Sequence, residues 1–290
     1  MVNLSLGCAQ FGMNYGYTNT RGKVNQDEVG EIIDLAIKNN IKSFDTAQSY
    51  GNSEEVLGKF LPKYENIKVI TKFLDTKKDY FETKDIYYWE NNFQKSLNNL
   101  KTNKVDSLLI HNTNDLKKKG KEILENWLDS LLERKLIDRL GISIYSVSEL
   151  DDISLKRFSL IQMPISLYDQ RLIKNETCQE LFNKNIAIHA RSIFFQGLLF
   201  SNYKNWPNAI SKNFKLHHYG LLNHLNKESI LALTLNFLNS YKFIENALFG
   251  VTSLEELKQI INIKNNLNLI KKDFIDFSWD NDSDLDPRLW

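Results

Sequence analysis

The feature that most constrains this chain is an alternation of short strand-like runs with amphipathic helical segments, repeated eight times in 290 residues. Strands are predicted at 4–7, 42–45, 68–72, 105–111, 140–143, 160–164, 186–191 and 247–250. Helices are predicted at 25–38, 53–61, 85–100, 120–135, 146–153, 177–185, 227–240 and 253–266. This pattern is typical of parallel strands joined by crossover helices, and the length suits one barrel better than two small domains. The sequence therefore predicts a single α/β domain over residues 1–290, a (β/α)8 TIM barrel.

Two segments do not fit the repeat. Residues 200–225 are expected to form a long loop on the face where the strands end, acting as a lid or a wall of a binding site. The tail at 273–290 carries aromatic residues that predict a strap onto the barrel, and its acidic run from Asp280 to Asp286 is expected to be solvated. Adjacent His217 and His218 are interpreted as loop residues and not as metal ligands, because no third ligand lies near them.

The charge balance restricts the class of partner. Lysine and arginine total 37 and aspartate and glutamate 36, so the formal net charge is +1. This argues against a protein held to nucleic acid or to an anionic membrane by bulk charge. Cys8 and Cys178 lack metal-ligand spacing and favour a reducing compartment. The first residues lack a signal-peptide pattern, and no apolar run reaches membrane-spanning length. A cytoplasmic protein without a metal site is the expectation.

Ionisable side chains stand at the ends of three successive strands. Asp45, Lys72 and His111 occupy these positions, and Tyr50 follows the first of them by five residues. Taken alone, Asp45 and Tyr50 are best interpreted as a loop-capping carboxylate and a half-buried aromatic ring, with Ser53 as the cap of the next helix. The two later strands change that interpretation, because the carboxyl ends of parallel strands meet on one active-site face. Buried strand ends seldom carry lone charges without a reason.

The same residues carry a family resemblance. The matching text, in order along residues 4 to about 262, is Asp45-Thr46-Ala47, Tyr50-Gly51, Ser53-Glu54, Leu57-Gly58, Ile70-Thr71-Lys72, Leu109-Ile110-His111, Gly141-Ile142-Ser143, Ile161-Gln162, Ala190-Arg191-Ser192, Gln196-Gly197-Leu198-Leu199 and Gly250-Val251-Thr252-Ser253-Leu254-Glu255-Glu256-Leu257. With these motifs the chain resembles the aldo-keto reductases. The residues alone predict that Asp45, Tyr50, Lys72 and His111 form a cluster. The resemblance implies the reaction that this cluster catalyses, which is carbonyl reduction with NADPH or NADH.

The resemblance assigns roles to the four residues. Tyr50 would donate the proton to the carbonyl oxygen, although a free phenol with a pKa of about 10 is a weak acid. A nearby Lys72 ammonium is expected to lower that pKa. Asp45 would pair with Lys72, and His111 would hydrogen-bond the carbonyl oxygen.

The resemblance also places the cofactor. Ser143 and Gln162 match residues that hold the nicotinamide carboxamide, with Ile144 where an asparagine commonly stands. Arg191 replaces a tyrosine that stacks on the nicotinamide; it can stack too, or it can bind phosphate or substrate. The pyrophosphate loop corresponds to Ser192, Gln196 and Gly197, and the adenosine end to Gly250, Thr252 and Ser253.

The adenosine end lacks the basic residues that usually bind a 2′-phosphate. Glu255 and Glu256 stand there instead, which predicts weak discrimination or a lean to NADH. Lys258, Arg191 or Arg288 remain candidates for reaching the phosphate.

Three functions follow from this sequence. The leading one is an NAD(P)H-dependent reductase of a small polar carbonyl compound, with a sugar favoured because similar sequences accompany bacterial surface-sugar biosynthesis. The second is a cofactor-binding regulator or sensor with little turnover. The third is redox-neutral epimerisation or elimination on a sugar with a retained nicotinamide. The sequence leaves the direction of the reaction and the oligomeric state open.

Overall fold

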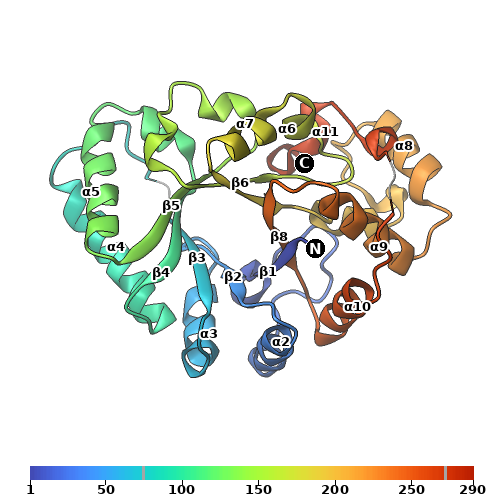
Figure 1. Ribbon diagram of the computed structural model, residues 1–290, viewed down its shortest axis with the longest axis horizontal. Helices are drawn as coiled ribbons and strands as arrows, with labels where there is room; N and C mark the ends of the chain where they lie inside the picture. Colours follow the sequence, from blue (N-terminus) through green and yellow to red (C-terminus); the bar gives the residue numbers. More distant parts are fainter. Residues whose placement is uncertain (74–75, 271–272) are drawn as a thin grey trace.

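The strands of this protein close into a barrel. The structure, a computed structural model, describes residues 1–73, 76–270 and 273–290. Each strand pairs in parallel with the next along the chain, and β1 pairs with β8 (Figure 1). The strands are β1 (Asn3–Gly7), β2 (Ser43–Asp45), β3 (Lys68–Phe73), β4 (Val105–Ile110), β5 (Ile137–Ser143), β6 (Leu160–Pro164), β7 (Ala187–Arg191) and β8 (Ile244–Gly250). The prediction of a single (β/α)8 barrel is confirmed.

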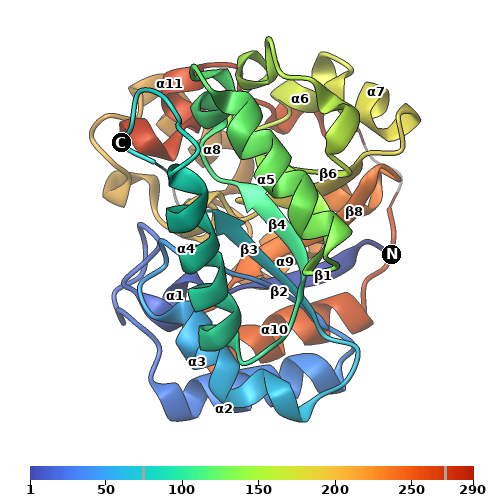
Figure 2. The same cartoon turned by 90° about the vertical axis from the view of Figure 1, so that its left-hand side faces the viewer.

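Helices surround the barrel, and Figure 2 shows α4 and α5 lying side by side on its outside. The helices are α1 (Ala9–Gly12), α2 (Gln26–Lys38), α3 (Ser53–Phe60), α4 (Asp85–Leu100), α5 (Lys121–Glu133), α6 (Arg171–Lys174), α7 (Thr177–Asn183), α8 (Lys212–Leu222), α9 (Lys227–Asn239), α10 (Leu254–Asn265) and α11 (Asp282–Leu285). Helix α2 illustrates why they form. Its apolar residues recur every three or four positions and are buried against the strands, while the Asn25 side chain accepts a hydrogen bond from the Asp27 amide and caps the first turn.

Two local predictions were wrong. The helix expected at 146–153 is a 3₁₀ helix at Val147–Leu150, followed by another at Leu155–Arg157. Asp152 between them has a φ of 63°, which no α-helix accommodates. The predicted cap Ser53 is the first residue of α3, and its hydroxyl donates to the Cys8 carbonyl at 2.7 Å. Ser53 therefore ties the loop after β1 to α3.

The segment at 200–225 is only partly a loop. Helix α8 occupies eleven of its residues, and the Ser211 hydroxyl caps it by accepting a hydrogen bond from the Phe214 amide. Phe214 is buried, with its ring 5.0 Å from Tyr168 and 4.9 Å from Trp279 of the tail. The prediction of a long loop was therefore wrong over α8, because aromatic packing orders this stretch.

The C-terminal tail packs onto the barrel as predicted, with Phe274 and Phe277 buried. Its acidic run is not uniformly solvated, however. Asp284 is 1% exposed and accepts hydrogen bonds from the Ser211 amide at 2.6 Å and from the Trp279 indole at 2.8 Å. The expectation of a solvated side chain is wrong at Asp284, because these protein donors take the place of water as hydrogen-bond partners of its carboxylate.

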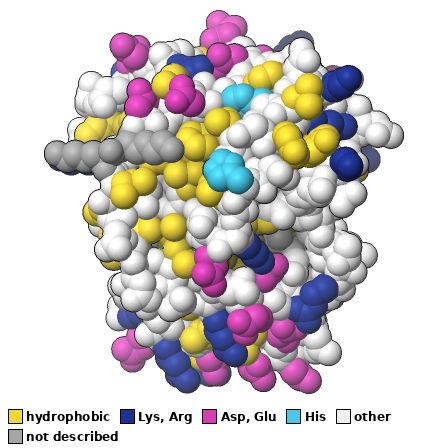
Figure 3. Space-filling model, turned by 90° about the vertical axis from the view of Figure 1, so that its right-hand side faces the viewer, with side chains coloured by type: hydrophobic (Ala, Val, Ile, Leu, Met, Phe, Trp, Pro, Cys, Tyr) yellow, Lys and Arg dark blue, Asp and Glu magenta, His cyan; other side chains and the backbone are white. Residues whose placement is uncertain are grey.

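The face over α8, α9 and α10 carries many hydrophobic side chains in its upper half, as Figure 3 shows. An apolar groove of about 640 Å³ lies there, between α8, α9, α10 and the segment that follows α10. Across 1–73, 76–270 and 273–290, no helix is long and apolar enough to cross a membrane. Within these same ranges, no cluster of three or more His, Cys, Asp or Glu is arranged to hold a metal ion.

Candidate active site

The four residues expected to cooperate meet at one mouth of the barrel. Asp45 ends β2, Lys72 lies near the end of β3, and His111 follows β4 directly. Tyr50 lies in the loop between β2 and α3, with its ring centroid 5.1 Å from the Lys72 ammonium and 6.1 Å from the His111 ring. The structure therefore brings together side chains that are up to 66 positions apart (from Asp45 to His111).

A buried ion pair forms the floor of this mouth. The Lys72 ammonium binds the Asp45 carboxylate and also donates to the Thr46 carbonyl at 2.9 Å. The other carboxylate oxygen of Asp45 accepts a 2.8 Å hydrogen bond from the Gln162 amide. Both charges are almost fully buried, and such charges persist only when paired and hydrogen-bonded. Gln162, predicted to bind the cofactor, thus also orients Asp45.

The pKa of Tyr50 differs from the expectation. Burial raises it well above its ordinary value, and the Asp45 carboxylate raises it further. The Lys72 ammonium, bound to Asp45 at close range, does not bring this pKa below its ordinary value as expected. Tyr50 is therefore protonated at neutral pH.

His111 is neutral in this setting. Burial lowers its pKa to about 3, and the cations Lys72 and Arg191 act in the same direction. Its Nδ1 faces the Ser49 hydroxyl at 3.5 Å. A neutral imidazole can donate one N–H to an oxygen in the mouth.

A cavity of about 430 Å³ extends from Tyr50 and Asp45 to the end of β8 and the start of α10. Seven of the predicted cofactor residues line it: Gln162, Arg191, Ser192, Gln196, Gly197, Gly250 and Thr252. Two do not. Ser143 is buried beside Gln162 in the strand register, and Ser253 caps α10 by accepting from the Glu256 amide. Lys72 and His111 also lie outside the lining.

The loop after β7 is backbone-strained. Ser192, Phe195 and Gln196 have positive φ angles of 57°, 49° and 56°, and Gly197 has a φ of 87°. Such conformations cost non-glycine residues free energy and cluster at functional sites. A Cβ at Gly197 would lie 2.0 Å from the Thr18 hydroxyl, so glycine is required there.

The segment after α1 also lines the cavity and contacts the loop after β7. The Gln196 amide donates to the Tyr15 hydroxyl at 3.0 Å, and the Thr18 hydroxyl donates to the Gln196 carbonyl at 3.4 Å. Tyr15, Thr18, Asn19, Thr20 and Arg21 all line the cavity. Sequence reasoning missed this contribution, because the segment carries no periodic pattern and no motif that marks it as part of a site.

Carboxylates occupy the amides at the start of α10. Glu28 Oε1 accepts from the Leu254 amide at 3.0 Å, and Glu256 Oε2 accepts from the Thr252 amide at 2.8 Å. Arg21 pairs with Glu28 at 3.0 Å, and Lys227 lies 3.7 Å from Glu256. Glu28, Arg21 and Lys227 were not predicted, since they come from segments distant from α10 in sequence.

One atom on the cavity wall is suited to a ligand. The Oε1 atom of Gln259 is buried and has no hydrogen-bond partner among the described residues. A buried carbonyl oxygen without a donor is costly, and an amino group of a bound molecule would satisfy it. The adenine of a dinucleotide carries such a group, so the cavity fits the cofactor that the resemblance implies.

Comparisons with known proteins agree with this geometry. Residues 3–277 match the model of the "Aldo/keto reductase family". An aldo-keto reductase from Bacillus halodurans, solved in its holo form, is 20% identical with a TM-score of 0.67, over 90% of this chain and 85% of that one. A Pseudomonas aeruginosa structure described as an aldo-keto reductase is 17% identical with a TM-score of 0.67, over 91% and 90%.

At these identities the two structures establish the shared fold alone. A search of curated protein sequences finds no significant match. The family model, by contrast, spans nearly the whole chain, including the strand ends that carry Asp45, Lys72 and His111. The chain therefore belongs to the aldo/keto reductase family, whose members are NAD(P)-dependent oxidoreductases.

Proposed function

We propose that this protein reduces the carbonyl group of a small polar molecule to an alcohol, with Tyr50 as the proton donor. The observation that carries the proposal is the meeting of Tyr50, the Lys72–Asp45 pair and neutral His111 beside a cavity that fits a dinucleotide. A sugar carbonyl is one substrate of this kind.

Each side chain has a defined task. The dihydronicotinamide of a bound cofactor supplies the hydride that no side chain can provide. Tyr50, protonated because its pKa is raised, gives its proton to the carbonyl oxygen as negative charge develops there. His111 donates an N–H to that oxygen and fixes its position. Lys72, 5.1 Å from the ring centroid, stabilises the phenolate that remains, and Asp45 holds Lys72 in place.

The cavity residues divide among the parts of the cofactor. Gln162 and Ser143, adjacent in the strand register, would hold the carboxamide. The strained loop with Ser192, Gln196 and Gly197 would line the pyrophosphate. Gln259 would accept from the adenine amino group.

The start of α10 favours NADH over NADPH. A helix start attracts phosphate through its free amides, but Glu28 and Glu256 already occupy the amides of Leu254 and Thr252. The nearby cations Arg21 and Lys227 are paired with these same carboxylates. A 2′-phosphate would have to displace two like-charged groups, whereas a ribose 2′-hydroxyl could donate to one. Glu255 plays no part, since it is exposed and pairs with Lys258.

The test is a turnover assay at 340 nm with NADH and with NADPH, over a panel of aldehydes, ketones and sugars. Oxidation of the cofactor that depends on substrate is the expected result. Tight cofactor retention with no net oxidation of any substrate would contradict it, and would point to redox-neutral sugar chemistry or to a sensor.

A further inference from the structure

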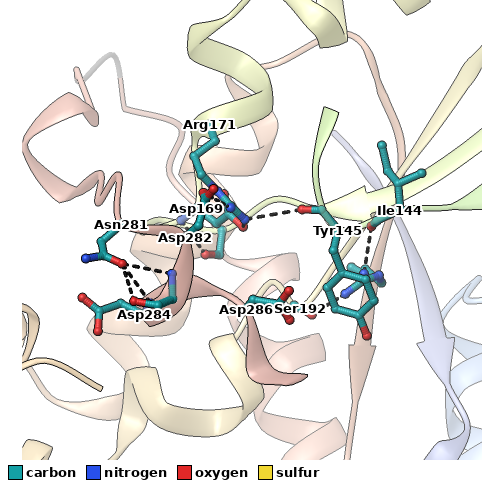
Figure 4. Close-up of polar contacts among 12 residues, drawn as sticks. Ile144, Tyr145, Asp169, Arg171, Ser192, Asn281, Asp282, Asp284 and Asp286 are labelled. Atoms are coloured by element: carbon teal, nitrogen blue, oxygen red, sulfur yellow. Dashed lines mark hydrogen bonds and ion pairs between the residues drawn. The ribbon is translucent and has the colours of Figure 1, made fainter. Parts of the chain in front are cut away.

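Among the described residues at the barrel mouth, Arg191 is a charged group that no carboxylate binds directly. Lys72 is paired with Asp45 there. Next to the mouth, Asp169 binds Arg171 at 2.7 Å and Asp286 binds Arg288 at 2.6 Å, and Figure 4 shows these two carboxylates apart from one another. Within 1–73, 76–270 and 273–290, no carboxylate forms an ion pair with Arg191.

The guanidinium of Arg191 is nevertheless held in place. It donates to the Ile144 carbonyl at 2.8 Å and to the Ser192 hydroxyl at 3.3 Å, both labelled in Figure 4. Its Cζ lies 3.9 Å from the Tyr145 ring centroid, and the Cζ of Arg288 lies 3.7 Å from the same centroid. Two guanidinium groups cannot share one ring face at this distance, so the Tyr145 ring lies between them. This packing fixes Arg191 before any ligand arrives.

Arg191 also retains the capacity to bind. A guanidinium has five N–H donors, and the contacts above use two of them. The side chain is half-buried and lines the cavity together with Tyr50. Lys72 is neutralised by Asp45, and His111 is neutral. The carboxylates of Asp169 and Asp286 are near enough to interact with Arg191 electrostatically, but each is bound to another arginine. A partly desolvated cation without a direct ion-pair partner is costly, and an anion bound beside it would remove that cost.

We propose that Arg191 binds an anionic group, carboxylate or phosphate, on the substrate whose carbonyl faces Tyr50. The substrate class is therefore a carbonyl compound that carries a negative charge. This assignment rests on the proposed function and narrows its range of substrates. A planar guanidinium matches both anions with two parallel hydrogen bonds.

The experiment compares a charged with a neutral substrate in two pairs, of which the first is matched in shape and the second differs by the phosphate group. One pair is 4-carboxybenzaldehyde and 4-formylbenzamide, and the other is glyceraldehyde 3-phosphate and glyceraldehyde, so the two pairs separate carboxylate from phosphate. At saturating cofactor, kcat/KM is expected to favour the anion at least tenfold in one pair, mainly through KM, which corresponds to about 1.4 kcal/mol. Each ratio is taken within one variant, so a general loss of activity cancels.

Three variants assign the preference. Arg191→Gln is expected to bring the ratio of kcat/KM for the charged over the neutral substrate to about one. Arg191→Lys is expected to leave an intermediate ratio, because lysine keeps the charge but cannot form two parallel hydrogen bonds. The matched control is Arg288→Gln. It also removes a guanidinium that packs on the Tyr145 ring, but this guanidinium is already paired with Asp286 and Glu149. It is expected to retain the ratio of the unaltered protein.

The outcomes that overturn the proposal are distinct. A ratio near one for both pairs in the unaltered protein rejects the anion site and leaves carbonyl reduction intact. A ratio that survives Arg191→Gln, together with weaker NADH binding, assigns Arg191 to the cofactor instead. If no compound is reduced, the proposed function fails, and the anion site is then tested alone by calorimetry with NAD⁺ present. Equal affinities for 4-(hydroxymethyl)benzoate and 4-(hydroxymethyl)benzamide reject the anion site. Tighter binding of the benzoate, lost in Arg191→Gln, supports it.

Discussion

The Gln162 amide donates a 2.8 Å hydrogen bond to the Asp45 carboxylate, on the oxygen that does not bind Lys72. The side chain expected to contact the nicotinamide thus also fixes the ion pair beneath Tyr50. In the proposed placement of the cofactor, one polar network would link cofactor position to proton chemistry, and substitutions at Gln162 should affect both.

Tyr50→Phe removes the proton donor and little else. We expect kcat for carbonyl reduction to fall by about 10² to 10⁴ or more, while the dissociation constant for NADH stays within about twofold. Steady-state kinetics and a cofactor fluorescence titration measure the two quantities. Near-normal turnover in this variant would falsify the mechanism.

Lys72→Met and Asp45→Asn should move the pH profile in opposite directions. Asp45 raises the pKa of Tyr50, and without Lys72 its uncompensated charge raises that pKa further. Alcohol oxidation needs the phenolate as base, so its rise with pH should shift to higher pH in Lys72→Met and to lower pH in Asp45→Asn. Both variants should lose most of their activity. Shifts of the same sign, or none, would show that the pair does not tune Tyr50.

His111 should not contribute an inflection near neutral pH. Its pKa is lowered to about 3, by burial first, so it stays neutral across the range of about pH 5 to 8 in which an ordinary histidine titrates. The profile of kcat/KM for reduction should therefore be flat through this range. An inflection near pH 6.5 that disappears in His111→Asn would contradict this assignment.

Cofactor choice depends on the carboxylates at α10. We expect NADH to bind as tightly as NADPH or more tightly, and Glu28→Gln and Glu256→Gln each to shift the ratio towards NADPH by about tenfold, or 1.4 kcal/mol. Fluorescence titrations with both cofactors provide the dissociation constants. The control is Glu255→Gln, since Glu255 is exposed and bound to Lys258. If the unaltered protein prefers NADPH a hundredfold, about 2.7 kcal/mol, a basic residue must complete the phosphate site.

Asp284 should be the most sensitive acidic residue of the tail. Its buried carboxylate accepts from the Ser211 amide and hydroxyl and from the Trp279 indole. Asp284→Ala leaves these donors without partners, so we expect the free energy of unfolding to fall by about 2 to 4 kcal/mol. Urea denaturation measures it. Asp280→Ala removes only an exposed pair with Lys174 and should cost less than about 0.5 kcal/mol; equal losses in both would show that burial of Asp284 is not decisive.

The sequence predicted the barrel and the four-residue cluster because both depend on local signals. Strand and helix periodicity is a property of neighbouring residues, and an ionisable residue at a strand's end marks the functional face directly. The chain order of parallel strands then brings Asp45, Lys72 and His111 together without further information.

The errors share a different physical origin. Asp284 looks solvated in an acidic run, and its burial depends on Ser211, 73 positions away. Lys72 was expected to lower the pKa of Tyr50. Burial and the Asp45 carboxylate raise that pKa, and only a structure shows how strongly each of them acts. Glu28 and Arg21 escaped notice because their contacts with α10 bridge more than 220 positions.

The pairing of β1 with β8 also has a consequence for synthesis. Ribosomes add about 5 to 20 residues per second, so a nascent β1 waits roughly 10 to 50 s before Ile244–Gly250 emerge to cover its open side. During that interval the unfinished sheet exposes unpaired backbone groups at its edges, which invite pairing with other chains.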